Sequence, residues 1–342
     1  MSASETSNQP VPGEISMEQV EQLASVRRRI EGQLRRRIVG MDNVIEHLLV
    51  ALFSKGHCLF IGVPGLAKTL LISTLAESIG LDFNRIQFTP DLMPSDITGT
   101  DVLEEDQASG KRRFVFVKGP VFCNLLLADE VNRTPPKTQA ALLQSMQEGV
   151  VTASGTDYQL EPPFHVFATQ NPIEQEGTYP LPEAQLDRFM LSVQVEYPTL
   201  EQEVTIVSQT TGLEDVVVEA VVSREELLRC QEVVRAIVVS PDVVNYAVRL
   251  AASTRPQSDM ASPFIREVVS WGAGPRASQY LVLGAKARAA MEGRPHASFA
   301  DVQALAHPVL AHRLALNFQA EAERISAADI VERLVSETSI QP

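Results

Sequence analysis

The sequence is poor in cysteine and has no long hydrophobic run. Its three cysteines stand far apart, at positions 58, 123 and 230 of 342 residues. That spacing excludes a disulfide-stapled scaffold, so we expect buried thiols in a reducing compartment, the cytoplasm. The six histidines show no zinc-type spacing with one another or with cysteine. No apolar run approaches the roughly 20 residues needed to cross a bilayer, and we expect a soluble protein without a membrane span.

Basic residues are also scarce. The chain has 29 Lys and Arg against 43 Asp and Glu, a formal net charge of −14. Phosphate contacts require Lys and Arg, so this balance disfavours nucleic acid as an obligatory partner. The visible basic clusters, residues 27–29 and 35–37, lie in a helix-like stretch. We interpret them as a solvated helix face, with an inter-subunit contact as the second choice.

The first 15 residues are nearly free of large apolar side chains, and they lack a basic flank and an apolar core. They are therefore predicted to be a disordered tail and not a signal peptide. The rest of the chain is long enough for two domains, and a hydrophobic content of 44% is enough for a substantial core.

An apolar run at residues 58–61 leads into a small-residue loop and then into a helix-like segment, residues 70–79. This order suits phosphate binding, because backbone N–H groups of the loop and the helix N-terminus point at phosphate oxygens. Lys68 is expected to bridge the β- and γ-phosphates, and the Thr69 hydroxyl to hold Mg²⁺. Ala67 replaces the second glycine of the general pattern, and we expect alanine to fit a helix start without strain. The predicted nucleotide-binding residues of this stretch are Gly62, Pro64, Gly65, Leu66, Ala67, Lys68, Thr69 and Leu70.

The third predicted core strand, the apolar run at residues 124–128, ends in two carboxylates, Asp129 and Glu130. Asp129 is predicted to bind Mg²⁺, partly through its water shell, and Glu130 to orient and deprotonate an attacking water. The alternative is a strand that ends in ordinary polar residues, which becomes the weaker interpretation after a phosphate-binding loop at a suitable distance.

Three further polar residues are candidates for the same site. Asn171, at the end of a fourth strand, is expected to hold the water or the γ-phosphate, or else only to form a turn before proline. Arg188 precedes the fifth strand and is predicted to reach the nucleotide of an adjacent subunit; a surface salt bridge with Asp187 or Glu183 is the alternative. Arg133 is a weaker candidate for that role. Arg276 begins a helix, where an arginine suggests an anionic partner; an ordinary surface arginine is the alternative.

The pattern along the chain favours an α/β fold with a mostly parallel sheet. A hairpin-like insertion at about residues 89–121 and a hairpin at about 149–160 interrupt the alternation. After residue 198 the predicted elements are helices, joined to the core through a segment near residues 214–223. These helices are expected at 224–239, 241–254, 276–291, 298–316 and 326–336. The predicted core strands are residues 58–61, 85–88, 124–128, 165–169 and 189–195.

These motifs together resemble those of the MoxR group of AAA+ ATPases: GVPGLAKT, LLLADE, ATQNP, EAQLDRF and GPRAS, in that order and spacing. The resemblance covers about residue 16 to the C-terminus. It implies a five-stranded parallel sheet in the order 5-1-4-3-2, followed by an all-helical lid domain. On this basis the ATPase core spans 16–198, with a helix-2 insert at 89–121 and a pre-sensor-1 hairpin at 149–160, and the lid spans 199–342.

The resemblance also implies a role for each candidate residue, with ATP and Mg²⁺ as cofactors. Val39 and Gly40 are expected beside the adenine. The implied roles are Lys68 and Thr69 as the Walker A pair, Asp129 and Glu130 as the Walker B pair, Asn171 as sensor 1, Arg188 as the arginine finger and Arg276 as sensor 2.

The function expected from the resemblance is a ring-forming ATP hydrolase, a homo-oligomer expected to be a hexamer. It would remodel, assemble or activate partner proteins, with a separate von Willebrand factor A domain protein or metal-cofactor loading as further expectations. A nucleic-acid motor is the alternative, against which the acidic balance argues. A non-hydrolysing nucleotide switch is disfavoured because both carboxylates and the candidate finger are present.

Overall fold

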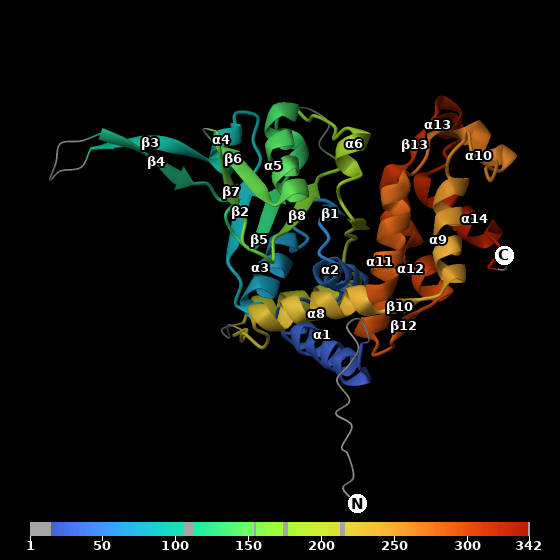
Figure 1. The fold of residues 1–342 in the computed structure, drawn as a ribbon, viewed down its shortest axis with the longest axis horizontal. Coiled ribbons are helices and arrows are strands. Elements are labelled where there is room, and N and C mark those ends of the chain that lie inside the picture. The colour runs from blue at the N-terminus through green and yellow to red at the C-terminus, as the bar shows by residue number, and fades with distance from the viewer. Residues whose placement is uncertain (1–14, 106–111, 154, 174–176, 213–215, 341–342) are drawn as a thin grey trace, which may run out of the picture.

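The computed structural model of the chain describes residues 15–105, 112–153, 155–173, 177–212 and 216–340. Nearly all of the predicted tail, residues 106–111 of the predicted insertion, Ser154 of the predicted second hairpin and residues 214–215 of the predicted linker lie outside the described residues. Figure 1 shows a sheet-containing core, from which one hairpin protrudes, beside a group of C-terminal helices.

The core sheet has five parallel strands in the order β2-β5-β8-β1-β9. Numbered by their own succession along the chain, and read from the other edge, they follow the order 5-1-4-3-2, so the predicted topology is confirmed. The strands are β1 (Cys58–Ile61), β2 (Phe83–Gln87), β5 (Leu125–Asp129), β8 (His165–Gln170) and β9 (Leu191–Gln194).

Both faces of the sheet are covered, because neighbouring strand residues point to opposite sides. Leu125 and Leu127 pack on one face with α1 (Met17–Arg37), α2 (Asp42–Phe53) and α3 (Lys68–Ile79). Leu126 and Ala128 pack on the other face with α4 (Pro94–Thr98) and α5 (Pro136–Glu148). Helix α1 begins with a capping box in which Ser16 is the N-cap and Gln19 the third helical residue.

Two hairpins interrupt the α/β alternation, as predicted. The first, β3 (Gly99–Glu105) with β4 (Arg112–Lys118), lies between β2 and β5 in the chain and protrudes from the core (Figure 1). The second, β6 (Val150–Ala153) with β7 (Thr156–Gln159), precedes β8. The ring of Phe116 in the first hairpin stacks on that of Tyr158 in the second, with centroids 4.2 Å apart. The base of the long hairpin is therefore fixed against the short one.

The basic residues of α1 form ion pairs with acidic residues around them. Arg35 lies 2.7 Å from Glu31, Arg37 lies 2.7 Å from Glu77 on α3, and Arg29 pairs with Glu226. This agrees with the interpretation as a solvated face. Among the residues that the structure describes, no helix is both long and apolar enough to cross a membrane.

The C-terminal part is helical, as predicted, and also contains two short strand pairs: β10 with β12 and β11 with β13. The helix expected over 298–316 ends at Leu310, because a 3-10 turn at Ala311–Arg313 directs the chain back toward the core. The helix Leu200–Thr210, with a Thr199 capping box, was not expected. Helix α6 (Glu183–Leu186) precedes β9 and belongs to the core. The elements of the C-terminal part are α7 (Leu200–Thr210), α8 (Arg224–Ala236), β10 (Val238–Val239), α9 (Pro241–Ser253), α10 (Pro263–Val268), β11 (Val269–Trp271), α11 (Pro275–Met291), β12 (His296–Ala297), α12 (Phe299–Leu310), β13 (Ala315–Leu316), α13 (Phe318–Glu323) and α14 (Ala327–Glu337).

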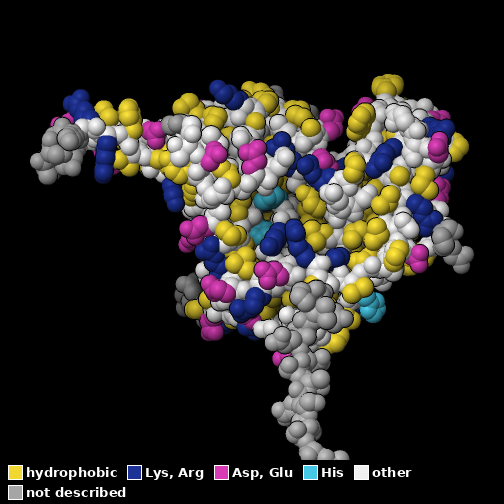
Figure 2. All heavy atoms as spheres, in the orientation of Figure 1, with side chains coloured by type: hydrophobic (Ala, Val, Ile, Leu, Met, Phe, Trp, Pro, Cys, Tyr) yellow, Lys and Arg dark blue, Asp and Glu magenta, His cyan; other side chains and the backbone are white. Residues whose placement is uncertain are grey.

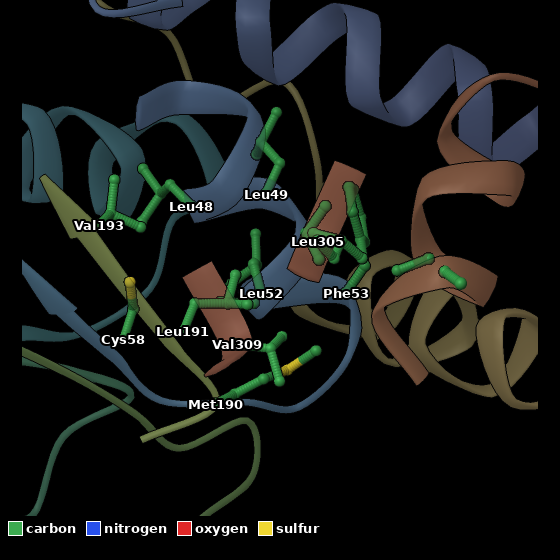
Figure 3. Packing of buried hydrophobic residues seen from close by; sticks show 14 of the residues in the cluster. Leu48, Leu49, Leu52, Phe53, Cys58, Met190, Leu191, Val193, Leu305 and Val309 are labelled. Atoms are coloured by element: carbon green, nitrogen blue, oxygen red, sulfur yellow. The ribbon is translucent and has the colours of Figure 1, made fainter. Parts of the chain in front are cut away.

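One hydrophobic cluster joins the core to the C-terminal helices. Figure 3 shows Leu305 and Val309 of α12 beside Leu52 and Phe53 of α2, with Met190 close to them. All five side chains are buried. Helix α12 is thus seated directly on the core, next to the segment that enters β9.

Candidate active site

The loop between β1 and α3 has the backbone that a phosphate-binding loop requires. A Cβ on Gly62 would lie 2.7 Å from the Val195 carbonyl oxygen, so this position accepts only glycine without movement. Gly65 has a φ of +86°, in the region that favours glycine. Ala67 has a φ of +50°, so the expectation of an unstrained alanine is wrong: a left-handed conformation costs a side-chain-bearing residue about 1–2 kcal/mol.

Lys68 is folded back onto this loop. Its Nζ donates to the carbonyl oxygens of Gly62, at 2.6 Å, and Val63, at 2.9 Å. Burial lowers the pKa of Lys68, and the charges of Asp129 and Glu130 act in the opposite direction. The ammonium group therefore lies in the loop, where phosphate oxygens can replace the two carbonyls. This geometry fits a nucleotide phosphate.

Thr169 of β8 joins the Asp129 carboxylate to the backbone of Glu130 at the end of β5. The Thr169 hydroxyl donates to Asp129 Oδ1 at 2.6 Å and accepts from the Glu130 N–H at 2.8 Å. Thr169 is buried, and Arg85 donates to the other oxygen of Asp129 at 2.6 Å. Asp129 is thereby held on both sides, as a hard-cation ligand needs.

The Glu130 carboxylate is held by two donors. Oε2 accepts from Gln87 Nε2 at 2.8 Å and from Arg133 at 2.9 Å. Gln87 ends β2 directly opposite Asp129 in the sheet register. Gln87 and Thr169 were not among the candidates, although both stand at the end of a strand, where the same rule that identified Asp129 applies.

Asn171 follows β8 and is buried. Its Oδ1 accepts from the Ile173 N–H at 3.1 Å, so the residue forms the turn that its position before proline suggested.

A cavity of about 970 Å³ adjoins the phosphate loop. Val39, which is predicted to lie beside the adenine, lines this cavity together with Pro64 to Ala67 and Leu70. Gly40 packs against Gln202, since a Cβ there would lie 2.6 Å from Gln202 Nε2. Helix α7 and His307 of α12 complete the wall, and neither was predicted to belong to the site.

The two candidate arginines lie elsewhere. Arg188 lines a separate cavity of about 280 Å³ beside α5. Arg276 donates from Nη1 to Asp187 Oδ2 at 2.8 Å, and Arg313 donates to Asp187 Oδ1 at 2.8 Å. The salt-bridge alternative for Arg188 therefore does not apply to Asp187, whose carboxylate is shared by two other arginines.

Comparison with known proteins agrees with this geometry. Residues 57–191 match the family model described as the ATPase family associated with various cellular activities (AAA), and residues 262–334 match the AAA lid domain. Chaperone MoxR1 of Mycobacterium tuberculosis is 42% identical over 308 residues, which are 90% of this chain and 80% of that protein. The chain belongs to the MoxR group of AAA ATPases.

Other relatives support the same placement. Protein MoxR of Methylorubrum extorquens is 31% identical, over 92% of this chain and 94% of that protein. A protein of Cytophaga hutchinsonii with a known crystal structure superposes on this chain with a TM-score of 0.88. The two sequences are 40% identical, and the match covers 95% of this chain and 98% of that protein's chain. As an AAA ATPase the chain binds and hydrolyses ATP, and its C-terminal helices correspond to the AAA lid.

Proposed function

We propose that this MoxR-type ATPase is a chaperone that uses ATP to remodel, assemble or activate partner proteins. The observation that carries the proposal is Thr169 joining Asp129 to Glu130, beside Lys68 and the phosphate loop. A hydrolytic site needs a metal-binding carboxylate and a base held in fixed relative positions. The Thr169 hydroxyl fixes the Asp129 carboxylate to the backbone of Glu130, and Gln87 and Arg133 hold the Glu130 carboxylate. The relative named Chaperone MoxR1 supports the protein-directed role.

Each residue has a role in this proposal. Lys68 and the loop amides hold the phosphates, Thr69 and Asp129 hold Mg²⁺, and Glu130 takes the proton of the attacking water. Mg²⁺, when bound, neutralises phosphate charge. Gln87 and Arg133 both donate to Oε2 of Glu130, so Oε1 is the oxygen expected to accept the proton. Asn171 orients the water, and Val39 and Gly40 border the base.

The active form is proposed to be a ring, expected to be a hexamer, in which Arg188 serves the neighbouring subunit. Arg188 lies in its own cavity beside α5 and outside the set of described residues that line the nucleotide cavity. That position suits a finger that acts in trans. Arg276 is proposed to sense the phosphates from the lid.

The protruding hairpin is proposed to engage the client. Leu103 and Phe114 face each other across β3 and β4 and are 50% and 74% exposed. Figure 2 shows hydrophobic side chains interspersed with basic ones along this hairpin. The client is expected to be a separate protein, with a von Willebrand factor A domain protein as the first candidate and metal-cofactor loading as a further role. Three free, buried cysteines support a reducing compartment, the cytoplasm.

The test is capture of the ATP-bound state. Glu130→Gln is expected to bind ATP, assemble and retain the client, whereas Lys68→Ala is expected to do none of these. Both variants are compared with wild type by sedimentation, ATPase assay and mass spectrometry of co-purifying proteins. Recovery of DNA, or stimulation of turnover by DNA at moderate salt, would favour the nucleic-acid motor instead.

A further inference from the structure

The residues that flank Arg188 are held by side chains from the lid. Arg313 Nη2 donates to the carbonyl oxygens of Asp187, at 3.1 Å, and Phe189, at 2.6 Å. The Tyr280 hydroxyl donates to the Arg188 carbonyl oxygen at 3.5 Å, and the His312 ring nitrogen lies 3.1 Å from the Phe189 oxygen. The backbone on both sides of Arg188 is therefore shaped by the lid.

Arg313 is the centre of this arrangement. Its side chain is 2% exposed, and its Nε donates to Asp187 Oδ1 at 2.8 Å. The guanidinium also lies 5.3 Å from the centroid of the Tyr280 ring. A buried arginine whose donors meet a carboxylate and several carbonyls fixes all of these groups in one geometry.

Asp187 also accepts from Arg276, the proposed sensor of the nucleotide phosphates. The Asp187 carboxylate is thus shared between a buried arginine, Arg313, and a more exposed one, Arg276. The Arg276 and Asp187 side chains are 35% and 28% exposed, so this contact can open without exposing the core.

We propose that the lid of each subunit positions its own Arg188, through Asp187 and Arg313, for the ATP site of the neighbouring subunit. ATP in a subunit's own site draws Arg276 away from Asp187 and leaves Asp187 to Arg313 alone. The segment that carries Arg188 then adopts the position required at the ATP site of the neighbouring subunit. Asp187, Arg313 and Tyr280 are positioning residues in this scheme, which rests on the proposed function because it needs a ring and a finger acting in trans.

The test uses mixed rings in which donor subunits carry Glu130→Gln and cannot hydrolyse ATP themselves. Donors are added in excess to wild-type subunits, so that most wild-type sites receive their finger from a donor. Asp187→Asn in the donor is expected to lower turnover of the wild-type sites at least tenfold, as Arg188→Ala does, since a 1 Å misplacement costs about that much or more. The matched control is Glu46→Gln, which weakens another core–lid ion pair, Glu46 with Arg288 at 2.9 Å, away from Arg188.

Nucleotide binding separates positioning from structural damage. Donors with Asp187→Asn are expected to bind ATP at least as tightly as their parent, because Arg276 is released toward the phosphates. In case Asp187→Asn does not fold, Tyr280→Phe removes only a hydroxyl and is expected to lower turnover roughly threefold, with Tyr246→Phe, elsewhere in the lid, as its control.

Two results would overturn the inference while Arg188→Ala donors still fail to support wild-type sites: full support by Asp187→Asn or Tyr280→Phe donors, or a loss matched by equally weakened ATP binding. Failure of the proposed function is distinguishable, because Arg188→Ala donors would then also support wild-type sites fully.

Discussion

Replacing Thr169 by valine tests how the site is held together. Valine has nearly the same shape as threonine but lacks the hydroxyl that donates to Asp129 at 2.6 Å and accepts from the Glu130 N–H at 2.8 Å. A hydrogen bond to a charged group contributes about 1.5–3 kcal/mol, and a buried donor left unpaired costs about 1–3 kcal/mol. Valine regains part of this through its extra apolar surface. We expect the free energy of unfolding to fall by about 2–4 kcal/mol.

The Thr169→Val variant is also expected to lose ATPase turnover. Without the hydroxyl, the Asp129 carboxylate loses its hydrogen-bonded connection to the backbone of Glu130. The loss of a group that orients a metal ligand costs about 10–100-fold in activity. Thr169→Ser is the matched control, since it keeps the hydroxyl and loses one methyl group, at about 1 kcal/mol. Urea denaturation and steady-state ATPase assays measure both quantities. Equal stability and equal turnover in the two variants would refute the bridging role.

Three further predictions follow from the backbone and from buried histidines. Gly62→Ala is expected to destabilise the chain by about 1–3 kcal/mol and to impair ATP binding, because its Cβ meets the Val195 carbonyl, and unchanged melting and affinity would contradict this. Ala67→Gly is expected to keep activity and stability within about 1 kcal/mol, since relief of the left-handed strain is offset by chain entropy, whereas Ala67→Val loses more than that in a melting experiment. Burial lowers the pKa of His57 and His165 to about 4, below an ordinary value of about 6.5, so the stability that their neutral forms contribute is complete above pH 6.5 and is lost as the pH falls toward 4. Each is expected to cost roughly 2 kcal/mol between pH 7.5 and pH 5, and urea midpoints that do not change over this range would disprove it.

The strands and the main site residues could be predicted because they depend on local signals, whereas the order of the strands came from the resemblance to the MoxR group. The loop before Lys68 and the carboxylates after β5 follow apolar strands whose carboxyl ends meet at one edge of a parallel sheet. The helix boundaries deviated where tertiary contacts decide them, as at the end of α12, where the chain turns so that Arg313 reaches the core.

The contacts that could not be predicted join residues that lie far apart in the sequence. Gln87 reaches Glu130 only because β2 and β5 pair in one particular register, and a single-residue shift would point it to the other face. Asp187 and Arg313 are 126 positions apart, and no sequence periodicity links them. The left-handed backbone of Ala67 likewise has no signature in the residue type, which is common in helices.

The most direct test of the account is a comparison of wild type with Glu130→Gln at saturating ATP and Mg²⁺, with ATP affinity measured in parallel. Glu130 is the residue proposed to take the proton of the attacking water, and its amide counterpart cannot accept one. The account predicts hydrolysis by wild type, a loss of at least about 100-fold in the variant, and an ATP affinity that is retained. Wild-type turnover in the variant would contradict it.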